Sequence, residues 1–152
     1  KRNAPIVLFS AQPFTAKLIM SNVKMFKYCW YWEKEKGTGF LNAKRQPLRV
    51  IEEICVFYEK QSQYHPQMVP LDKPYRHTLP INDTAINNKV KSIEEGNPNE
   101  RQYQDYTSTY PKSILKFSRD KANKSLVPTQ KPVKLLEYLV KTYTSEGDLI
   151  LD

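Results

Sequence analysis

A short polar segment between two prolines opens the part of the chain whose pattern best suits cofactor binding. The segment 128–132 reads Pro-Thr-Gln-Lys-Pro, and apolar residues at helical spacing follow it over 133–144. Gly147 ends that helix, and the apolar run 149–151 predicts a buried strand that ends at Asp152. A polar turn, a helix and a strand ending in Asp form half of a cofactor-binding βα unit. A glycine-rich loop is expected next and is not among these 152 residues, so we expect an enzyme with part of its active site missing from this sequence.

The charge of the chain is unevenly distributed. Residues 1–60 carry a net charge of +6, residues 61–126 carry +3, and the last 26 residues carry −1. A cationic first third suits a polyanion, for which phosphate is the obvious candidate. An ordinary basic surface is the alternative.

The elements that must position these groups follow from the apolar patterning. The continuous run 6–9 predicts a fully buried strand, which is typical of a parallel sheet. Apolar residues within 14–26 fit a helical stripe. The aromatic run 26–32 and the run 53–58 predict two strands that form an antiparallel hairpin on a mostly parallel sheet. Between these strands, the segment 35–49 is too long for a tight turn and is rich in Gly, Lys and Arg.

The region 61–112 has a different character. Six prolines break it, tyrosines and polar residues dominate it, and it shows no sustained period. We predict an irregular insertion there, followed by a short strand over 113–117. Because strands flanked by helices occur at both ends, the chain as a whole predicts an α/β fold.

The two cysteines, Cys29 and Cys55, lie in apolar strand-like runs. Buried free thiols in a reducing compartment are the expected state, and a disulfide between neighbouring strands is the alternative. His65 and His77 lack zinc-like spacing from the cysteines, so we expect no metal site. No apolar run reaches the ~20 residues that span a bilayer, and no signal peptide is visible. We therefore expect a cytoplasmic protein without a membrane partner.

Four segments of the chain carry a joint resemblance to a known enzyme family. They are the strand and turn 6–14, the aromatic and glycine-rich segment 30–47, the strand 52–57, and the turn 128–132 with its helix and Asp-ending strand. Together they resemble the β-class amino DNA methyltransferases, which transfer a methyl group from S-adenosylmethionine to N6 of adenine or N4 of cytosine. The resemblance implies an α/β fold: an incomplete, permuted Rossmann-like methyltransferase sheet with an antiparallel hairpin and an irregular target-recognition insertion.

The resemblance also implies a division of the chain. Residues 1–60 would supply part of the catalytic half of the core, 61–126 the target-recognition region, and 127–152 the start of the cofactor-binding half. The family's catalytic tetrapeptide, Asp/Asn/Ser-Pro-Pro-Tyr/Phe, does not occur in this sequence. The nearest match, 72–75, has Lys in place of the first Pro and no preceding strand, so we assign no catalytic residue.

Three sets of site residues are implied by the resemblance. Ser10 and Gln12, at the end of the first strand, would line the pocket of the flipped base, with capping and turn formation as the alternative. A second set would contact the cofactor, with generic helix capping as the alternative: Thr129, Gln130, Lys131 and Asp152. A third set would clamp the DNA phosphates, with a solvated basic loop as the alternative: Lys34, Gly37, Thr38, Gly39, Lys44, Arg45 and Arg49.

The sequence departs from the family pattern at one position before the turn. Val127 stands where many relatives carry His before the Pro. In the target-recognition region, plain surface polarity explains any single polar residue as well as base contact does. The side chains there that could reach base edges are Arg76, Asn82, Asn87, Asn88, Lys89, Arg101, Gln102 and Gln104.

The implied function is site-specific methylation of double-stranded DNA with the target base flipped, at adenine N6 ahead of cytosine N4. We expect residues 1–152 to be inactive alone. The alternatives are a catalytically dead DNA-binding remnant of a truncated prophage methyltransferase and a fragment or partly ordered copy of a complete enzyme. A bacterial or phage origin, a restriction–modification role with a cognate endonuclease, and a homodimer that buries an incomplete sheet edge belong to the same expectation.

Overall fold

The structure is a computed structural model that describes residues 3–78, 103–119 and 130–151. Its contacts divide the chain into two compact units. Residues 1–67 with 112–152 form the first unit, and residues 68–111 form the second. Each unit contains its own sheet.

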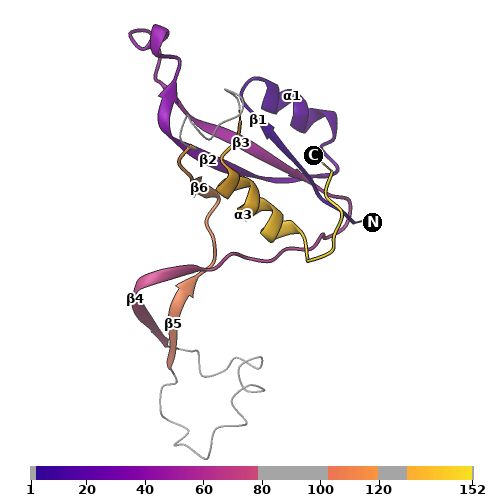
Figure 1. Cartoon of the computed structure of the whole chain (residues 1–152), viewed down its shortest axis with the longest axis vertical. Coiled ribbons are helices and arrows are strands. Elements are labelled where there is room, and N and C mark those ends of the chain that lie inside the picture. The colour runs from indigo at the N-terminus through magenta and orange to yellow at the C-terminus, as the bar shows by residue number, and fades with distance from the viewer. Residues whose placement is uncertain (1–2, 79–102, 120–129, 152) are drawn as a thin grey trace, which may run out of the picture. The chain divides into compact units, whose positions relative to one another are not determined.

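The first unit is built on a four-stranded mixed sheet. Its strands are β1 (Ile6–Ser10), β2 (Phe26–Thr38), β3 (Arg49–Phe57) and β6 (Ile114–Lys116). They lie in the order β1-β3-β2-β6 (Figure 1). β3 is antiparallel to both β1 and β2, whereas β6 is parallel to β2. β1 and β2 therefore run in the same direction on either side of β3.

This topology confirms the antiparallel hairpin and the short strand over 113–117, and it corrects two other expectations. For the described residues, the prediction of a mostly parallel sheet is wrong, because β3 inserts between the two parallel strands β1 and β2. The prediction that 6–9 is fully buried is also wrong. β1 lies at an edge of the sheet, and its side chains alternate between exposed and half-buried until the buried Ser10.

The hydrophobic core lies between the sheet and one helix. α3 (Val133–Tyr143) begins where its apolar stripe predicts and ends one residue earlier than predicted, with Thr144 rather than Gly147 at its C-cap. Leu135, Leu139 and Tyr143 of the stripe are buried on the sheet, whereas Val133, Leu136 and Val140 stay exposed. The strands contribute side chains from one face only, because side chains alternate along each strand. The buried core consists of Trp30, Trp32, Ile54, Val56, Leu115, Leu135, Leu139 and Tyr143.

The other face of the sheet meets α1 (Phe14–Ser21), which is shorter than its apolar stripe predicts. Thr15 on α1 donates to Ser10 Oγ at 2.9 Å and contacts a Glu53 carboxylate oxygen at 3.3 Å. Asn22 is the C-cap residue, where φ −153° and ψ 64° leave the helical region. Its backbone and side-chain oxygens both accept from the backbone N–H of Met25 in the turn that follows. The chain then enters β2 four residues later.

The β2–β3 hairpin ends in a compact tip. Both strands extend further than predicted, so the connection shrinks from 35–49 to residues 39–48. The pairing shifts register between Glu33 and Thr38, and at Gly37 an added Cβ would lie 2.7 Å from Leu48 Cβ. Gly39 has φ 91° and precedes the 3₁₀ turn η1 (Phe40–Asn42). Glycine is thus required at Gly37 by close approach and is favoured at Gly39 by its dihedral angle.

The apolar run after α3 does not form the predicted buried strand. Leu149 and Leu151 are 98% and 97% exposed, and no strand is assigned to 149–151. A strand must pair its backbone groups with a neighbour, and the described part of the chain places no strand beside this run. Apolar composition alone therefore misled the prediction.

The second unit contains a two-stranded antiparallel sheet where we predicted irregular structure. β4 (Val69–Thr78) pairs with β5 (Tyr103–Thr109), with a register shift between Pro70 and Tyr75. The rings of Tyr75 and Tyr106 stack at 5.2 Å between centroids. Prolines are tolerated in these strands because a two-stranded sheet leaves an outer edge on each strand. Stacking between tyrosines thus contributes contacts to a sheet that the sequence, which has no apolar period there, did not predict.

Candidate nucleic-acid and cofactor site

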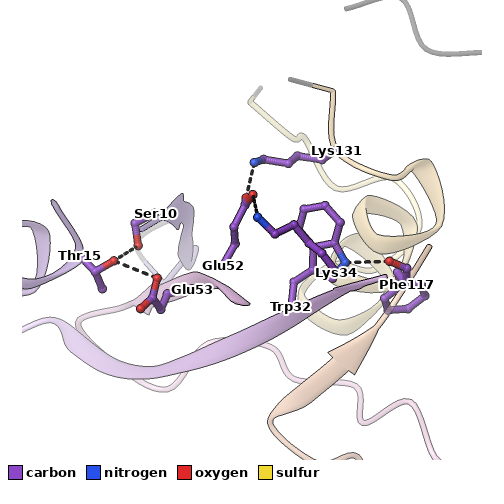
Figure 2. Close-up of polar contacts among 8 residues, drawn as sticks. All are labelled: Ser10, Thr15, Trp32, Lys34, Glu52, Glu53, Phe117 and Lys131. Atoms are coloured by element: carbon purple, nitrogen blue, oxygen red, sulfur yellow. Dashed lines mark hydrogen bonds and ion pairs between the residues drawn. The ribbon is translucent and has the colours of Figure 1, made fainter. Parts of the chain in front are cut away.

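Glu52 lies between two ammonium groups from distant parts of the chain (Figure 2). On β3, its Oε1 is 3.1 Å from Lys34 Nζ of β2, and its Oε2 is 2.5 Å from Lys131 Nζ. Lys131 comes immediately before Pro132, the N-cap residue of α3. The three charges join the two hairpin strands to the start of the helix that covers the core.

Aromatic rings hold the Lys131 ammonium in place. Its Nζ lies 5.0 Å from the ring centroid of Phe9 on β1 and 5.7 Å from that of Trp32 on β2. Both distances are within the range of cation–π attraction. Trp32 is itself fixed, because its Nε1 donates a hydrogen bond of 2.8 Å to the carbonyl of Phe117. Side chains from three strands therefore surround one cation at the N-terminal end of α3.

The electrostatics of this cluster favour an ionised carboxylate. Burial pushes the pKa of Glu52 upward, but the hydrogen bonds and charges of Lys131 and Lys34 outweigh burial, so the pKa lies below its ordinary value. With one carboxylate and two ammonium groups, the cluster carries one excess positive charge. Lys131 is the more exposed of the two cations. A second carboxylate could therefore approach Lys131 without leaving Glu52 unpaired.

The structure describes two of the four residues that we predict to contact the cofactor. Gln130 and Lys131 are half-buried before α3, whereas Thr129 and Asp152 lie outside the described residues. Pro132 occupies the N-cap position without a side-chain cap hydrogen bond. Capping with a proline at the first helical position is therefore not the arrangement at this end of α3.

The basic residues predicted to clamp DNA divide into two environments. Lys44, Arg45 and Arg49 are all exposed at the hairpin tip. Lys34 differs, because it is only 6% exposed and is ion-paired with Glu52. A buried, paired ammonium does not present its charge to a phosphate, so we remove Lys34 from the DNA-contacting set and assign it to holding Glu52.

The glycines and threonine of the same set shape the tip. Gly37 permits the close approach of Leu48, and Gly39 permits the positive φ before η1. Thr38 Oγ1 donates to the carbonyl of Arg49 at 3.3 Å. These contacts give each residue a structural role, and direct DNA contact by any of them stays a prediction.

The two residues predicted to line a base pocket lie in different surroundings. Ser10 Oγ is buried, accepts from Thr15 Oγ1 at 2.9 Å, and lies 3.4 Å from Cys55 Sγ. Gln12 is exposed, and a cis peptide bond joins it to Pro13. Ser10 thus belongs to a buried polar cluster on the α1 face, whereas Gln12 is free to meet solvent or a ligand.

Sequence reasoning missed Glu52, the residue that organises the cation cluster. Its signal was present, because Glu52 alternates with Ile54 and Val56 on the buried face of β3. A carboxylate on a buried face needs a cationic partner. What could not be foreseen is which cations would be within reach, since Lys131 is 79 positions away.

The cysteines are free in the structure, as the preferred interpretation expects. Cys29 and Cys55 face each other across β2 and β3, and their sulfur atoms lie 3.6 Å apart. Burial, and then the hydrogen bond with Cys55, raises the pKa of Cys29 to about 12. Among the described residues, no group of three or more His, Cys, Asp or Glu side chains gathers as a metal site would require. No described helix is long and apolar enough to cross a membrane.

Comparison with known proteins adds an independent finding. The model of a protein family described as DNA methylase, covering N6- and N4-specific enzymes, matches residues 2–152 of this chain. A search of the curated proteins returns no match. The match extends over both units and includes the hairpin tip, Glu52 and Lys131.

Proposed function

We propose that this chain, which belongs to the N6-adenine and N4-cytosine DNA methylase family, serves site-specific methylation of duplex DNA with S-adenosylmethionine as the methyl donor. We place adenine N6 ahead of cytosine N4 as the acceptor. The observation that carries the proposal is the family match over residues 2–152. The exposed basic tip and the Lys131 cluster supply two binding functions that such a reaction needs.

The hairpin tip fits the DNA side of this reaction. Lys44, Arg45 and Arg49 are exposed, and exposed cations gain affinity for a phosphate backbone by releasing its counterions. Such contacts fix the position of the duplex without reading its sequence. An enzyme that modifies a base must first take it out of the stack, and a firm hold on the flanking phosphates keeps the duplex in place meanwhile.

Lys131 fits the cofactor side. When bound, S-adenosylmethionine supplies an electrophilic methyl group on a sulfonium centre, and its amino-acid end carries a carboxylate. The Lys131 ammonium is partly exposed and can donate a hydrogen bond to a second carboxylate, because Lys34 continues to neutralise Glu52. Gln130 precedes it in the chain and carries an amide. We assign these two residues to orienting the cofactor and keep Thr129 and Asp152 as further proposals.

The division of labour along the chain is part of the proposal. Residues 1–60 contribute to the catalytic half, 61–126 to target recognition, and 127–152 to the cofactor-binding half of a permuted Rossmann-like sheet. The compact unit formed by 68–111 falls within the proposed recognition region. A homodimer and a cognate restriction endonuclease are the partners we propose besides DNA.

A second candidate function rests on one feature of the sequence. These 152 residues contain no Pro-Pro-Tyr or Pro-Pro-Phe segment, so a catalytically dead DNA-binding remnant would also present the same hairpin and cation cluster. The intact mass of the natural gene product separates the candidates. A mass of 17.9 kDa, that of these residues alone, favours the remnant, and a larger mass favours the enzyme.

A methyl-transfer assay then tests the proposed reaction. The natural gene product is incubated with duplex DNA and S-adenosylmethionine that carries a radiolabelled methyl group, and the DNA is digested to nucleosides for chromatography. We expect label in N6-methyladenine. Label in N4-methylcytosine would replace the proposed acceptor, and DNA binding without any label would support the remnant.

A calorimetric titration tests whether residues 1–152 alone form a complete cofactor site. We expect S-adenosylmethionine to bind weakly or not at all, because Lys131 and Gln130 form only one side of the proposed site. Saturable micromolar binding by this chain would contradict that expectation.

A further inference from the structure

The tip of the β2–β3 hairpin exposes two large apolar side chains side by side. Phe40 is 79% exposed and Leu41 is 99% exposed, both within the 3₁₀ turn η1. Their burial therefore contributes little to the stability of this fold. An adjacent pair of exposed large apolar residues is a feature that calls for a binding partner more than for a role in the core.

The turn that carries them is a defined structure. Asn42 N–H donates to the Gly39 carbonyl at 2.9 Å, and Ala43 N–H donates to the Phe40 carbonyl at 3.0 Å. Arg45 N–H donates to the Asn42 carbonyl at 2.8 Å. Because these bonds fix the backbone on both sides of Phe40, the two apolar side chains project from a preformed turn and lose little freedom on binding.

The surroundings of the tip specify the charge of its partner. From Lys36 to Ile51 the chain has four basic side chains, those of Lys36, Lys44, Arg45 and Arg49, and no acidic one. Within this segment every charged side chain that accompanies the apolar pair is a cation, and such a combination is complementary to an apolar slot bordered by anions. Stacked bases between two phosphate backbones provide that combination. A second copy of this chain, with a net charge of +8, does not provide it through its overall charge.

We propose that Phe40 and Leu41 insert into the base stack of duplex DNA while Lys44 and Arg45 hold the phosphates on either side. Apolar side chains that wedge between base pairs unstack them and open the duplex. The inference rests on the proposed function and deepens it, because a wedge at this position would fill the space that an extruded base leaves behind.

The test uses the 152-residue chain and two duplexes that differ at one position. One duplex is fully paired, and the other has a single abasic site, where the stack is already open and insertion costs least. Affinity is measured by fluorescence anisotropy for the wild-type chain, for Phe40→Ala/Leu41→Ala and for Lys44→Ala/Arg45→Ala. A matched control, Met20→Ala/Val23→Ala, removes two exposed apolar side chains from outside the hairpin.

We expect the wild-type chain to prefer the abasic duplex by about five-fold or more, as stacking of one aromatic side chain allows. Phe40→Ala/Leu41→Ala should lose this preference. Lys44→Ala/Arg45→Ala should weaken binding to both duplexes by the same factor, and the Met20/Val23 control should behave like wild type. Because all the altered side chains are exposed, circular dichroism should show each variant folded.

Four results would overturn the inference. Equal affinity of the wild type for the two duplexes, or an undiminished preference in Phe40→Ala/Leu41→Ala, would exclude insertion while leaving DNA binding by the basic residues intact. A change of oligomeric mass in that variant by light scattering, with its duplex preference kept, would assign the tip to a protein contact. Absence of any DNA binding by the wild-type chain would remove the inference and the proposed DNA-binding function together.

Discussion

Glu52 on β3 and Lys131 before α3 lie 2.5 Å apart at their charged atoms, although 79 positions separate them in the chain. This ion pair ties the hairpin to the segment that precedes the core-covering helix. Its geometry makes Glu52 a structural residue and leaves Lys131 half-buried beside aromatic rings. Substitutions at Glu52 therefore test the cluster on which the cofactor assignment depends.

Replacing Glu52 with Gln should destabilise the fold by about 3 kcal/mol, because it leaves the buried Lys34 ammonium without its counter-charge. The matched control is Glu33→Gln, which breaks the exposed pair with Lys116 on the neighbouring strand. That pair should contribute less than about 1 kcal/mol. Urea denaturation measures both, and equal losses in the two variants would contradict the special role of Glu52.

The same carboxylate should make stability depend on pH. Because the pKa of Glu52 is lowered in the folded state, its ionised form stabilises the fold above the ordinary glutamate pKa of about 4.3. That contribution should disappear as the pH falls below 4.3 toward the lower folded-state value. The difference in unfolding free energy between wild type and Glu52→Gln should therefore shrink between pH 7 and pH 3. A difference that stays constant over this range would be inconsistent with the pairing.

The paired hydroxyl groups of Tyr143 on α3 and Tyr28 on β2 should contribute to the stability of the core. Tyr143 OH accepts from Trp30 Nε1 at 2.6 Å and lies 2.7 Å from Tyr28 OH. Tyr143→Phe leaves the buried indole N–H of Trp30 unpaired, which should cost about 1–3 kcal/mol. Tyr28→Phe keeps the Trp30 bond and should cost less. Chemical denaturation measures how much unfolding free energy each variant loses. A larger loss for Tyr28→Phe would contradict the role of Tyr143 as the partner of the Trp30 indole.

The cysteine pair should be unreactive in the folded protein. Burial and the contact with Cys55 raise the pKa of Cys29 to about 12, so its thiolate, the reactive form, is scarce at pH 8. Alkylation of native protein by iodoacetamide, followed by mass spectrometry, should be slow and should become fast after unfolding in urea. Native labelling as rapid as that of free cysteine would argue against the buried arrangement.

Local sequence patterns predicted which helices and strands form. The features that they did not predict depend on pairing between residues far apart in the chain. The stripe over 133–144 and the aromatic hairpin are local patterns, and both are confirmed. The neighbours β1, β3 and β2 are antiparallel because β3 inserts between β1 and β2. No local sequence period encodes that insertion. Composition alone also predicted a strand over 149–151, although a strand requires a partner as well as apolar side chains.

The candidate site also depends on pairing between residues far apart in the chain. The exposure of Lys44 and Arg45 agrees with their place in a polar loop, but Lys34 looked like one more surface cation. Its burial depends on Glu52 across the hairpin, so only the pairing of β2 with β3 distinguishes it from the exposed basic residues. Thr129 and Asp152, and the polar residues between 79 and 102, lie outside the described residues, so their assignments stay predictions.

The salt dependence of DNA affinity tests the central claim most directly. Binding of duplex DNA to the 152-residue chain is measured by fluorescence anisotropy from low to high salt, for wild type and for Lys44→Ala/Arg45→Ala. We predict that affinity falls steeply as salt rises, and that loss of two phosphate contacts makes the log–log slope shallower by about 1.8. Wild-type affinity that stays the same across the salt range, or a slope that the double substitution leaves unchanged, would contradict the claim that this hairpin holds DNA.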